Sequence, residues 1–239
     1  MDILYLMAEG GKGEELKYSL RTLVNLPHER VFIAGGCPGC IDKSKVVHIP
    51  TKQSGTKYEN STTNLKAACN DPRLSEDFIL MNDDFFITQP IENPAQELAL
   101  NRGKLDDVYQ FYFNKFAGSS GWAKGMRDTG NWLKKRGISE PLCYELHLPM
   151  IMNKRKVLDM FDLPGIDKLP IFHKRSAYGN IYNIGGEKTK DVKITSSSIF
   201  KPENVGKFLS CDDVSFPVIK LFLDLKYSAK SEYEIQERK

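Results

Sequence analysis

The sequence predicts an α/β fold with a mostly parallel sheet flanked by helices. Over residues 1–90, short apolar runs alternate with segments whose apolar residues recur at helical spacing. Such alternation is typical of strand–helix–strand units, which place helices on both faces of a parallel sheet. Sheets of this kind bind their ligands at the carboxyl ends of the strands. A chain of 239 residues can form one well-packed domain, so we expect residues 1–239 to be a single unit.

Composition and charge narrow the class of protein. Apolar residues make up 41% and charged residues 27%, as in ordinary soluble globular proteins. The net charge of 34 − 31 = +3 neither indicates nor excludes a nucleic-acid binder. No run approaches the ~18 apolar residues that span a bilayer, and the short apolar N-terminal run lacks the features of an export signal. The five cysteines are an odd number at scattered positions, which favours reduced thiols and a cytoplasmic location.

The elements follow in order from apolar periodicity and capping residues. Strands are expected over residues 3–7, 31–34, 45–49 and 78–81, and helices over 14–25 and 57–70. Residues from about 92 to 140 are helix-prone and interrupted by a Gly-Ser-Ser-Gly run, so they are interpreted as a helical insertion or lid.

The remaining chain is expected to contribute further elements and then a tail. A strand-like run over 143–152 precedes a helix over 153–162 that is capped by Asn153. A turn at 165–170, a helix at 173–182, a strand at 192–195 and a helix at 215–226 follow. The last dozen residues are polar and are expected to form a surface tail.

The strongest chemical signal is the acidic motif Asn82-Asp83-Asp84 at the end of an apolar strand. Adjacent carboxylates flanked by large apolar residues are costly unless a cation or hydrogen bonds offset their desolvation. Carboxylate oxygens suit Mn²⁺ or Mg²⁺, which also bind substrate phosphates and neutralise a leaving diphosphate. The motif therefore predicts that Asp83 and Asp84 bind metal, with Asp84 also catalytic. A strand-ending turn is the simpler alternative.

A second candidate is the pair Glu145 and His147, which alternation would place on one face of a strand. Such a pair is suited to activating an acceptor hydroxyl, with His147 taking the proton. The alternative is a buried histidine bonded to a backbone carbonyl.

Basic side chains elsewhere are candidates for binding donor phosphates. Lys17 and Arg21 lie four residues apart on the first predicted helix, and Arg175 lies in a basic and polar segment. Together with Asn82, they form the predicted donor and phosphate site, although basic residues beside an apolar helix face are usually solvated.

Several segments together resemble, in collinear order, the Stealth proteins, which are bacterial capsule sugar-phosphate transferases. The matching segments are Glu15–Leu23, Arg30–Gly36, Asp71–Phe78, Leu80–Phe86 and, more loosely, His147–Pro149 and Lys174–Ser176. The resemblance implies a GT-A-like (Rossmann-like) fold that binds a nucleotide sugar, with Asp83 and Asp84 in the metal role and His147 as candidate base. The compact chain is also similar to small glycosyltransferase-like proteins of bacteria and phages.

Together, these observations predict a metal-dependent glycosyltransferase that transfers a sugar from a nucleotide-sugar donor to an acceptor hydroxyl. Sugar-1-phosphate transfer of the Stealth type and a non-catalytic nucleotide-sugar-binding module remain as alternatives. The acceptor is open between a glycan and a nucleic acid, such as a modified base in phage DNA. Basic and aromatic residues alternate over 113–136, and a nucleic acid would use them for backbone contacts and stacking, whereas a solvated lid is the other interpretation.

Overall fold

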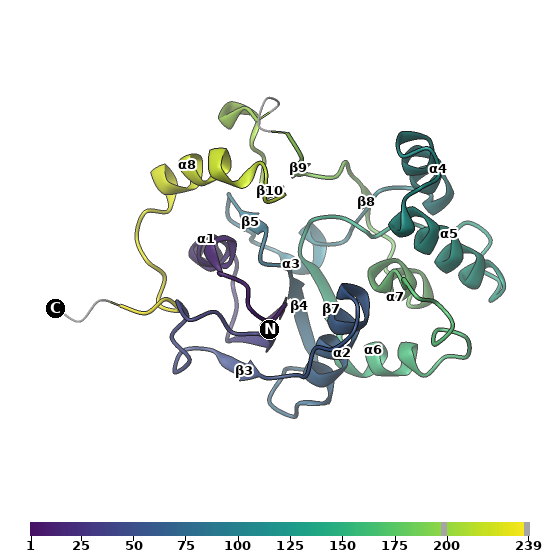
Figure 1. The fold of residues 1–239 in the computed structure, drawn as a ribbon, viewed down its shortest axis with the longest axis horizontal. Coiled ribbons are helices and arrows are strands. Elements are labelled where there is room, and N and C mark those ends of the chain that lie inside the picture. Colours follow the sequence, from purple (N-terminus) through teal and green to yellow (C-terminus); the bar gives the residue numbers. More distant parts are fainter. Residues whose placement is uncertain (197–199, 237–239) are drawn as a thin grey trace.

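A five-stranded sheet forms the centre of the molecule, in the order β3-β2-β1-β4-β7 (Figure 1). The computed structural model describes residues 1–196 and 200–236. The first four strands in the chain are mutually parallel and the fifth is an antiparallel edge, so the prediction of a mostly parallel sheet is confirmed. The strands are β1 (Asp2–Met7), β2 (Val31–Gly35), β3 (Val47–Ile49), β4 (Asp77–Met81) and β7 (Met150–Asn153).

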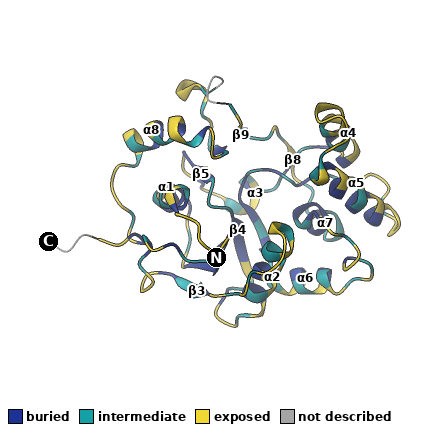
Figure 2. Ribbon diagram, viewed as in Figure 1, coloured by how far each residue is buried: buried dark blue, intermediate teal, exposed yellow. Residues whose placement is uncertain are grey.

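Helices cover both faces of this sheet, which explains why its strands consist of nearly continuous apolar residues. Successive side chains of β1, such as Ile3 and Leu4, belong to different apolar clusters on opposite faces of the sheet. Figure 2 shows the resulting buried centre and the exposed outer helix surfaces. One cluster contains residues of α2 (Lys57–Asn70), α6 (Lys154–Phe161) and α7 (Lys174–Ile181), and the other contains residues of α1 (Glu14–Thr22) and η1 (Leu23–Asn25).

A smaller three-stranded sheet begins immediately after the acidic motif. Strand β5 (Phe85–Ile87) pairs antiparallel with β10 (Phe208–Cys211), which pairs parallel with β9 (Lys193–Ile194). Helix α8 (Phe216–Lys226) packs on this sheet and on α1 through a third apolar cluster. Among the described residues, no helix combines the length and hydrophobicity needed to cross a bilayer.

The region expected to be helical after residue 90 contains two full helices and minor elements. Helices α4 (Leu105–Lys115) and α5 (Gly121–Lys134) pack against each other, and α5 also contacts α7. Figure 1 shows them together at one side of the molecule. This region also contains α3 (Pro94–Glu97) and β6 (Leu100–Asn101). The partner of β6, β8 (Glu187–Lys188), and the short helix η3 (Pro202–Asn204) lie later in the chain.

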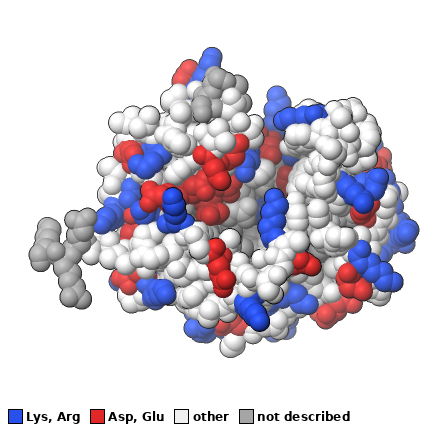
Figure 3. Space-filling model, in the orientation of Figure 1, with Lys and Arg blue, Asp and Glu red and all other residues white. Residues whose placement is uncertain are grey.

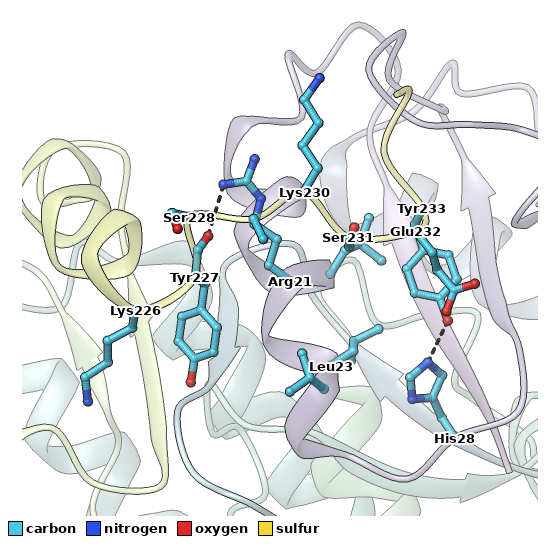
Figure 4. Close-up of a pocket in the computed structure, with 13 residues that line it drawn as sticks. Arg21, Leu23, His28, Lys226, Tyr227, Ser228, Lys230, Ser231, Glu232 and Tyr233 are labelled. Atoms are coloured by element: carbon cyan, nitrogen blue, oxygen red, sulfur yellow. Dashed lines mark hydrogen bonds between the residues drawn. The ribbon is translucent and has the colours of Figure 1, made fainter. Parts of the chain in front are cut away.

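The polar C-terminal segment is docked, so the expectation of a surface tail is wrong for its described part. The backbone at Glu234 forms an antiparallel bridge with Ile41, and the Glu234 side chain is only 3% exposed. Its carboxylate receives two hydrogen bonds of 2.8 Å from the guanidinium of Arg21 on α1. Figure 4 shows Arg21 also reaching the Tyr227 carbonyl, and His28 bonded to the Tyr233 hydroxyl. The polar composition of the segment did not predict this docking, because the docking depends on one ion pair between residues distant in the sequence.

We expect Glu234→Ala to lower the free energy of unfolding by about 3 kcal/mol, because it leaves the Arg21 guanidinium buried without its anion. Replacing both partners, as in Arg21→Met with Glu234→Leu, should cost less than the single change. Thermal and urea unfolding would measure both.

The matched control is Asp128→Ala, whose ion pair with Arg127 is exposed and should contribute less than about 1 kcal/mol. A Glu234→Ala protein as stable as this control would contradict the docking of the C-terminal segment.

Candidate active site

The acidic motif forms the turn between β4 and β5, at the carboxyl end of the central sheet. The Asn82 carbonyl accepts a hydrogen bond of 3.2 Å from the Phe85 amide, which closes the turn. Strand β4 ends where its run of four buried apolar residues is followed by the polar residues of the motif. The Asp84 carboxylate accepts hydrogen bonds from Lys193 of β9 at 3.0 Å and from Ser210 of β10 at 3.1 Å. The second sheet therefore holds one of the two acids in place.

The second acid lies in a repulsive electrostatic environment. Burial, followed by the charge of Asp84, raises the pKa of Asp83 to about 6. Burial, followed by the charges of Asp83 and Asp84, raises the pKa of Glu15 on α1 to about 7. Asp213 adds to the negative field at both groups, and Lys193 opposes it. Figure 3 shows acidic side chains gathered at the rim of a hollow on this face.

These carboxylates fit the oxygen donors that Mn²⁺ and Mg²⁺ prefer, and a cation would relieve their repulsion. Over residues 1–196 and 200–236, no group of three or more His, Cys, Asp or Glu side chains is placed to hold a metal. Mg²⁺ typically uses one or two carboxylates and completes its shell with water and substrate phosphates. Asp83 and Asp84 match that incomplete set, so their role as metal ligands remains a prediction.

His147 is oriented by Asp191, a residue that the sequence did not single out. The ring Nδ1 lies 2.9 Å and 3.0 Å from the two Asp191 oxygens, and the His147 amide donates to the same carboxylate. Burial alone would raise the pKa of Asp191, but His147 and then Arg102 lower it below its ordinary value. No described group bonds to Nε2, and the side chain is 31% exposed. The edge contact with the Phe85 ring, 6.2 Å between centroids, places His147 beside the acidic turn.

The predicted pairing of Glu145 with His147 is wrong, because residues 143–149 do not form a strand. The Leu146 amide bonds to the Tyr144 carbonyl at 2.8 Å, and this tight turn breaks the alternation at Glu145. Glu145 instead accepts hydrogen bonds from the Ser176 amide and hydroxyl at 3.0 Å and 3.2 Å.

The environment of Glu145 keeps it ionised. Burial would raise its pKa, but His173, the Ser176 amide and the charge of Arg175 outweigh burial and lower it to about 2. Such a carboxylate is a poor proton acceptor near neutral pH, and it anchors the first turn of α7.

Arg175 connects the two halves of the site from inside the protein. Its guanidinium donates to the Leu148 carbonyl at 2.5 Å and to the Leu80 carbonyl at 3.5 Å, and it lies 5.3 Å from the centre of the Phe85 ring. Burial lowers its pKa, against the opposing charges of Glu145, Asp84 and Asp191. Arg175 thus joins the end of β4 to the segment that carries His147.

The two basic residues predicted on α1 have protein partners. Glu234 and the Tyr227 carbonyl bind the Arg21 guanidinium, so its predicted contact with a phosphate would require it to leave them and stays a prediction. Lys17 pairs with Glu14 and is 25% exposed, so its contact with a phosphate remains a prediction.

Lys174 is the basic residue that the prediction passed over in favour of its neighbour Arg175. A cavity of about 210 Å³ lies at the ends of β1 and β4, and Lys174, Arg175, Asn82 and Glu145 are among its lining residues. The sequence signal for Lys174 was the basic segment itself.

Asp191 lies 44 residues from His147, and no local pattern links the two.

Comparison with known proteins bears on the fold. No protein-family profile matches the chain, and no curated protein sequence matches it. Among solved structures, it resembles the galactosyltransferase LgtC, determined in complex with donor and acceptor sugar analogs. The TM-score is 0.52 at 9% identity, over 97% of this chain and 98% of that one. The expected GT-A-like fold is therefore confirmed, and the identity is too low to carry more than the fold.

We expect Asp83→Asn to stabilise the metal-free protein by on the order of 1–3 kcal/mol near neutral pH, because it removes a buried charge. Since the folded-state pKa is raised from 3.8 to about 6, the charged form destabilises the fold. The destabilisation is absent below about pH 4 and complete above about pH 6, so the gain from asparagine should grow across that interval.

Urea unfolding with EDTA at several pH values would measure this gain, with Asp128→Asn, at a carboxylate 30% exposed, as control. An equal gain at all pH values would contradict the environment assigned to Asp83.

Proposed function

We propose that the chain is a glycosyltransferase that moves a sugar from a nucleotide-sugar donor to an acceptor hydroxyl, with the help of a divalent cation. The observation that carries this proposal is the pair Asp83 and Asp84, half-buried and close enough that the charge of Asp84 raises the pKa of Asp83, at the carboxyl end of the parallel strands. This is the position where sheets of this class bind ligands. The fold shared with a galactosyltransferase supports the same chemistry.

The cation would be Mn²⁺ or Mg²⁺, held by Asp83 and Asp84 together with donor phosphates. When bound, it supplies positive charge that stabilises the leaving diphosphate. Lys193 and Ser210 hold Asp84 in one orientation, which leaves Asp83 as the more adjustable ligand. Asn82 closes the turn that presents both acids.

His147 is suited to act as the base for the acceptor. Asp191 bonds Nδ1 and so fixes the tautomer in which neutral Nε2 carries a lone pair. The acceptor oxygen attacks the anomeric carbon, its proton moves to Nε2, and the carbon–oxygen bond to the diphosphate breaks with its electron pair leaving on the diphosphate. Arg175 positions this step, because it links the Leu148 and Leu80 carbonyls.

The basic residues of the segment 113–136 bear on whether the acceptor is a nucleic acid. Within residues 113–136, Arg127 pairs with Asp128, Lys134 pairs with Asp106, and the Arg136 guanidinium lies 3.7 Å from the centre of the Trp132 ring. Since these exposed cations are paired within the protein, we propose a hydroxyl acceptor and assign them no contact with DNA.

We expect turnover of a nucleotide sugar to require Mn²⁺ or Mg²⁺ and to fall at least about 100-fold in both Asp83→Asn and Asp84→Asn. Calorimetry with a panel of nucleotide sugars, with and without Mn²⁺, would identify the donor. Analysis of the released nucleotide would then follow.

Each outcome distinguishes a different function. Release of nucleoside diphosphate supports glycosyl transfer, whereas nucleoside monophosphate would show sugar-1-phosphate transfer. Metal-dependent binding without turnover would indicate a binding module. Full activity of both variants would overturn the metal assignment.

We expect His147→Ala to lower kcat by about 10²- to 10⁴-fold with a smaller effect on KM, because the acceptor loses its base. Asp191→Asn should lower kcat and alter its pH profile, because it removes the charge that fixes the imidazole. Glu145→Gln serves as the comparison, since it leaves the His147–Asp191 pair intact. A product that retains the anomeric configuration would exclude this single-displacement role for His147.

A further inference from the structure

The cavity beside the acidic turn is lined in part by Lys174, a polar residue to which the proposed transfer reaction gives no role. It lies between the ends of β1 and β4, where Leu6 and Leu80 contribute to its wall, and the beginning of α7. Its volume of about 210 Å³ is below the roughly 300 Å³ of pockets that take drug-sized ligands. It therefore has room for one small unit and not for a whole nucleotide sugar.

Lys174 brings a positive charge to this cavity that no neighbour neutralises directly. Among the described residues, its amine has no hydrogen-bonding or ion-pair partner. Burial lowers its pKa to about 8, against the opposing effect of Glu145. Glu145 is the acid lining this cavity, and its oxygens already interact with Ser176 and His173.

The start of α7 reinforces the preference for a negative ligand. This helix begins at Lys174, and His173 before it provides no side-chain cap. Glu145 accepts the Ser176 amide, while the amides of Lys174 and Arg175 have no acceptor among the described residues. Free amides and the helix dipole at such an end favour anions.

We propose that this cavity is an anion subsite in which Lys174 receives a carboxylate or phosphate group carried by a sugar substrate. The identification of the ligand as a sugar rests on the proposed function. Asn82 lies in the lining of the cavity and in the turn that presents Asp83 and Asp84, so the two sites adjoin. A substrate reaching both would carry a negative group in addition to the leaving diphosphate.

The test uses the whole protein in EDTA, which removes any binding mediated by a metal at the acidic turn. Glucuronate and glucose 1-phosphate distinguish a sugar carboxylate from a sugar phosphate, inorganic phosphate reports an anion without a sugar, and glucose is the neutral probe. Binding would be followed by NMR titration. We expect at least one anionic sugar to bind and glucose not to bind at the same concentration.

Lys174→Met should weaken that binding by about 10-fold or more, because it removes the charge at similar length. Lys174→Arg should preserve part of it, and the exposed Lys124→Met should bind as the unmodified protein does. Thermal unfolding confirms that each variant is folded.

Absence of binding by every anionic probe, equal binding of glucose, or unchanged binding by Lys174→Met would overturn the proposal. Anion binding that survives while no nucleotide sugar is turned over would overturn only the proposed function. Transfer without any anion binding in EDTA would overturn only the subsite.

Discussion

The buried guanidinium of Arg175 is the contact on which the candidate site depends. Removing a cation from water is costly, and here the cost is offset by two backbone carbonyls and by the charges of Asp84, Asp191 and Glu145. The arginine thus fixes β4, which ends in the acidic turn, relative to the irregular segment that carries His147. The antiparallel pairing of Leu80 with Met150 also holds the two segments together, and Arg175 extends this link to Leu148, beyond the last paired residue.

The site also concentrates charges whose energies oppose folding. Asp83 and Glu15 both have raised pKa values because burial and neighbouring acids disfavour their ionised forms. Close by, Lys174 has a lowered pKa for the mirror-image reason, the burial of a cation. The acids and the lysine amine are thus suited to a ligand that carries a metal-bound diphosphate at one end and a further negative group at the other. Without a ligand, these charges make the protein less stable than its apolar core alone would allow.

The main elements could be predicted because their signals are local. Helix α2 begins and ends where the sequence predicts, since Thr56 and Glu59 form a capping box at its start. The strands β1, β2 and β4 are buried on both faces and therefore appear as unbroken apolar runs.

What the sequence missed depends on contacts between distant residues. Alternating residues around Glu145 suggested a strand, but one turn at Tyr144 and Leu146 removed the register. Asp191 and Glu234 acquire their roles from His147 and Arg21, to which no spacing rule connects them. The short strands β5 and β10 likewise depend on pairing across more than a hundred residues.

The ion pair between Arg21 and Glu234 has a consequence for how the chain is made. Its two members lie 213 residues apart, so α1 leaves the ribosome long before the carboxylate that neutralises it. Contacts of such separation form late, because closing the intervening chain costs entropy that only later packing recovers. During synthesis the Arg21 guanidinium therefore lacks its carboxylate partner until the C-terminal segment has left the ribosome, although the apolar residues of α1 pack on strands made earlier.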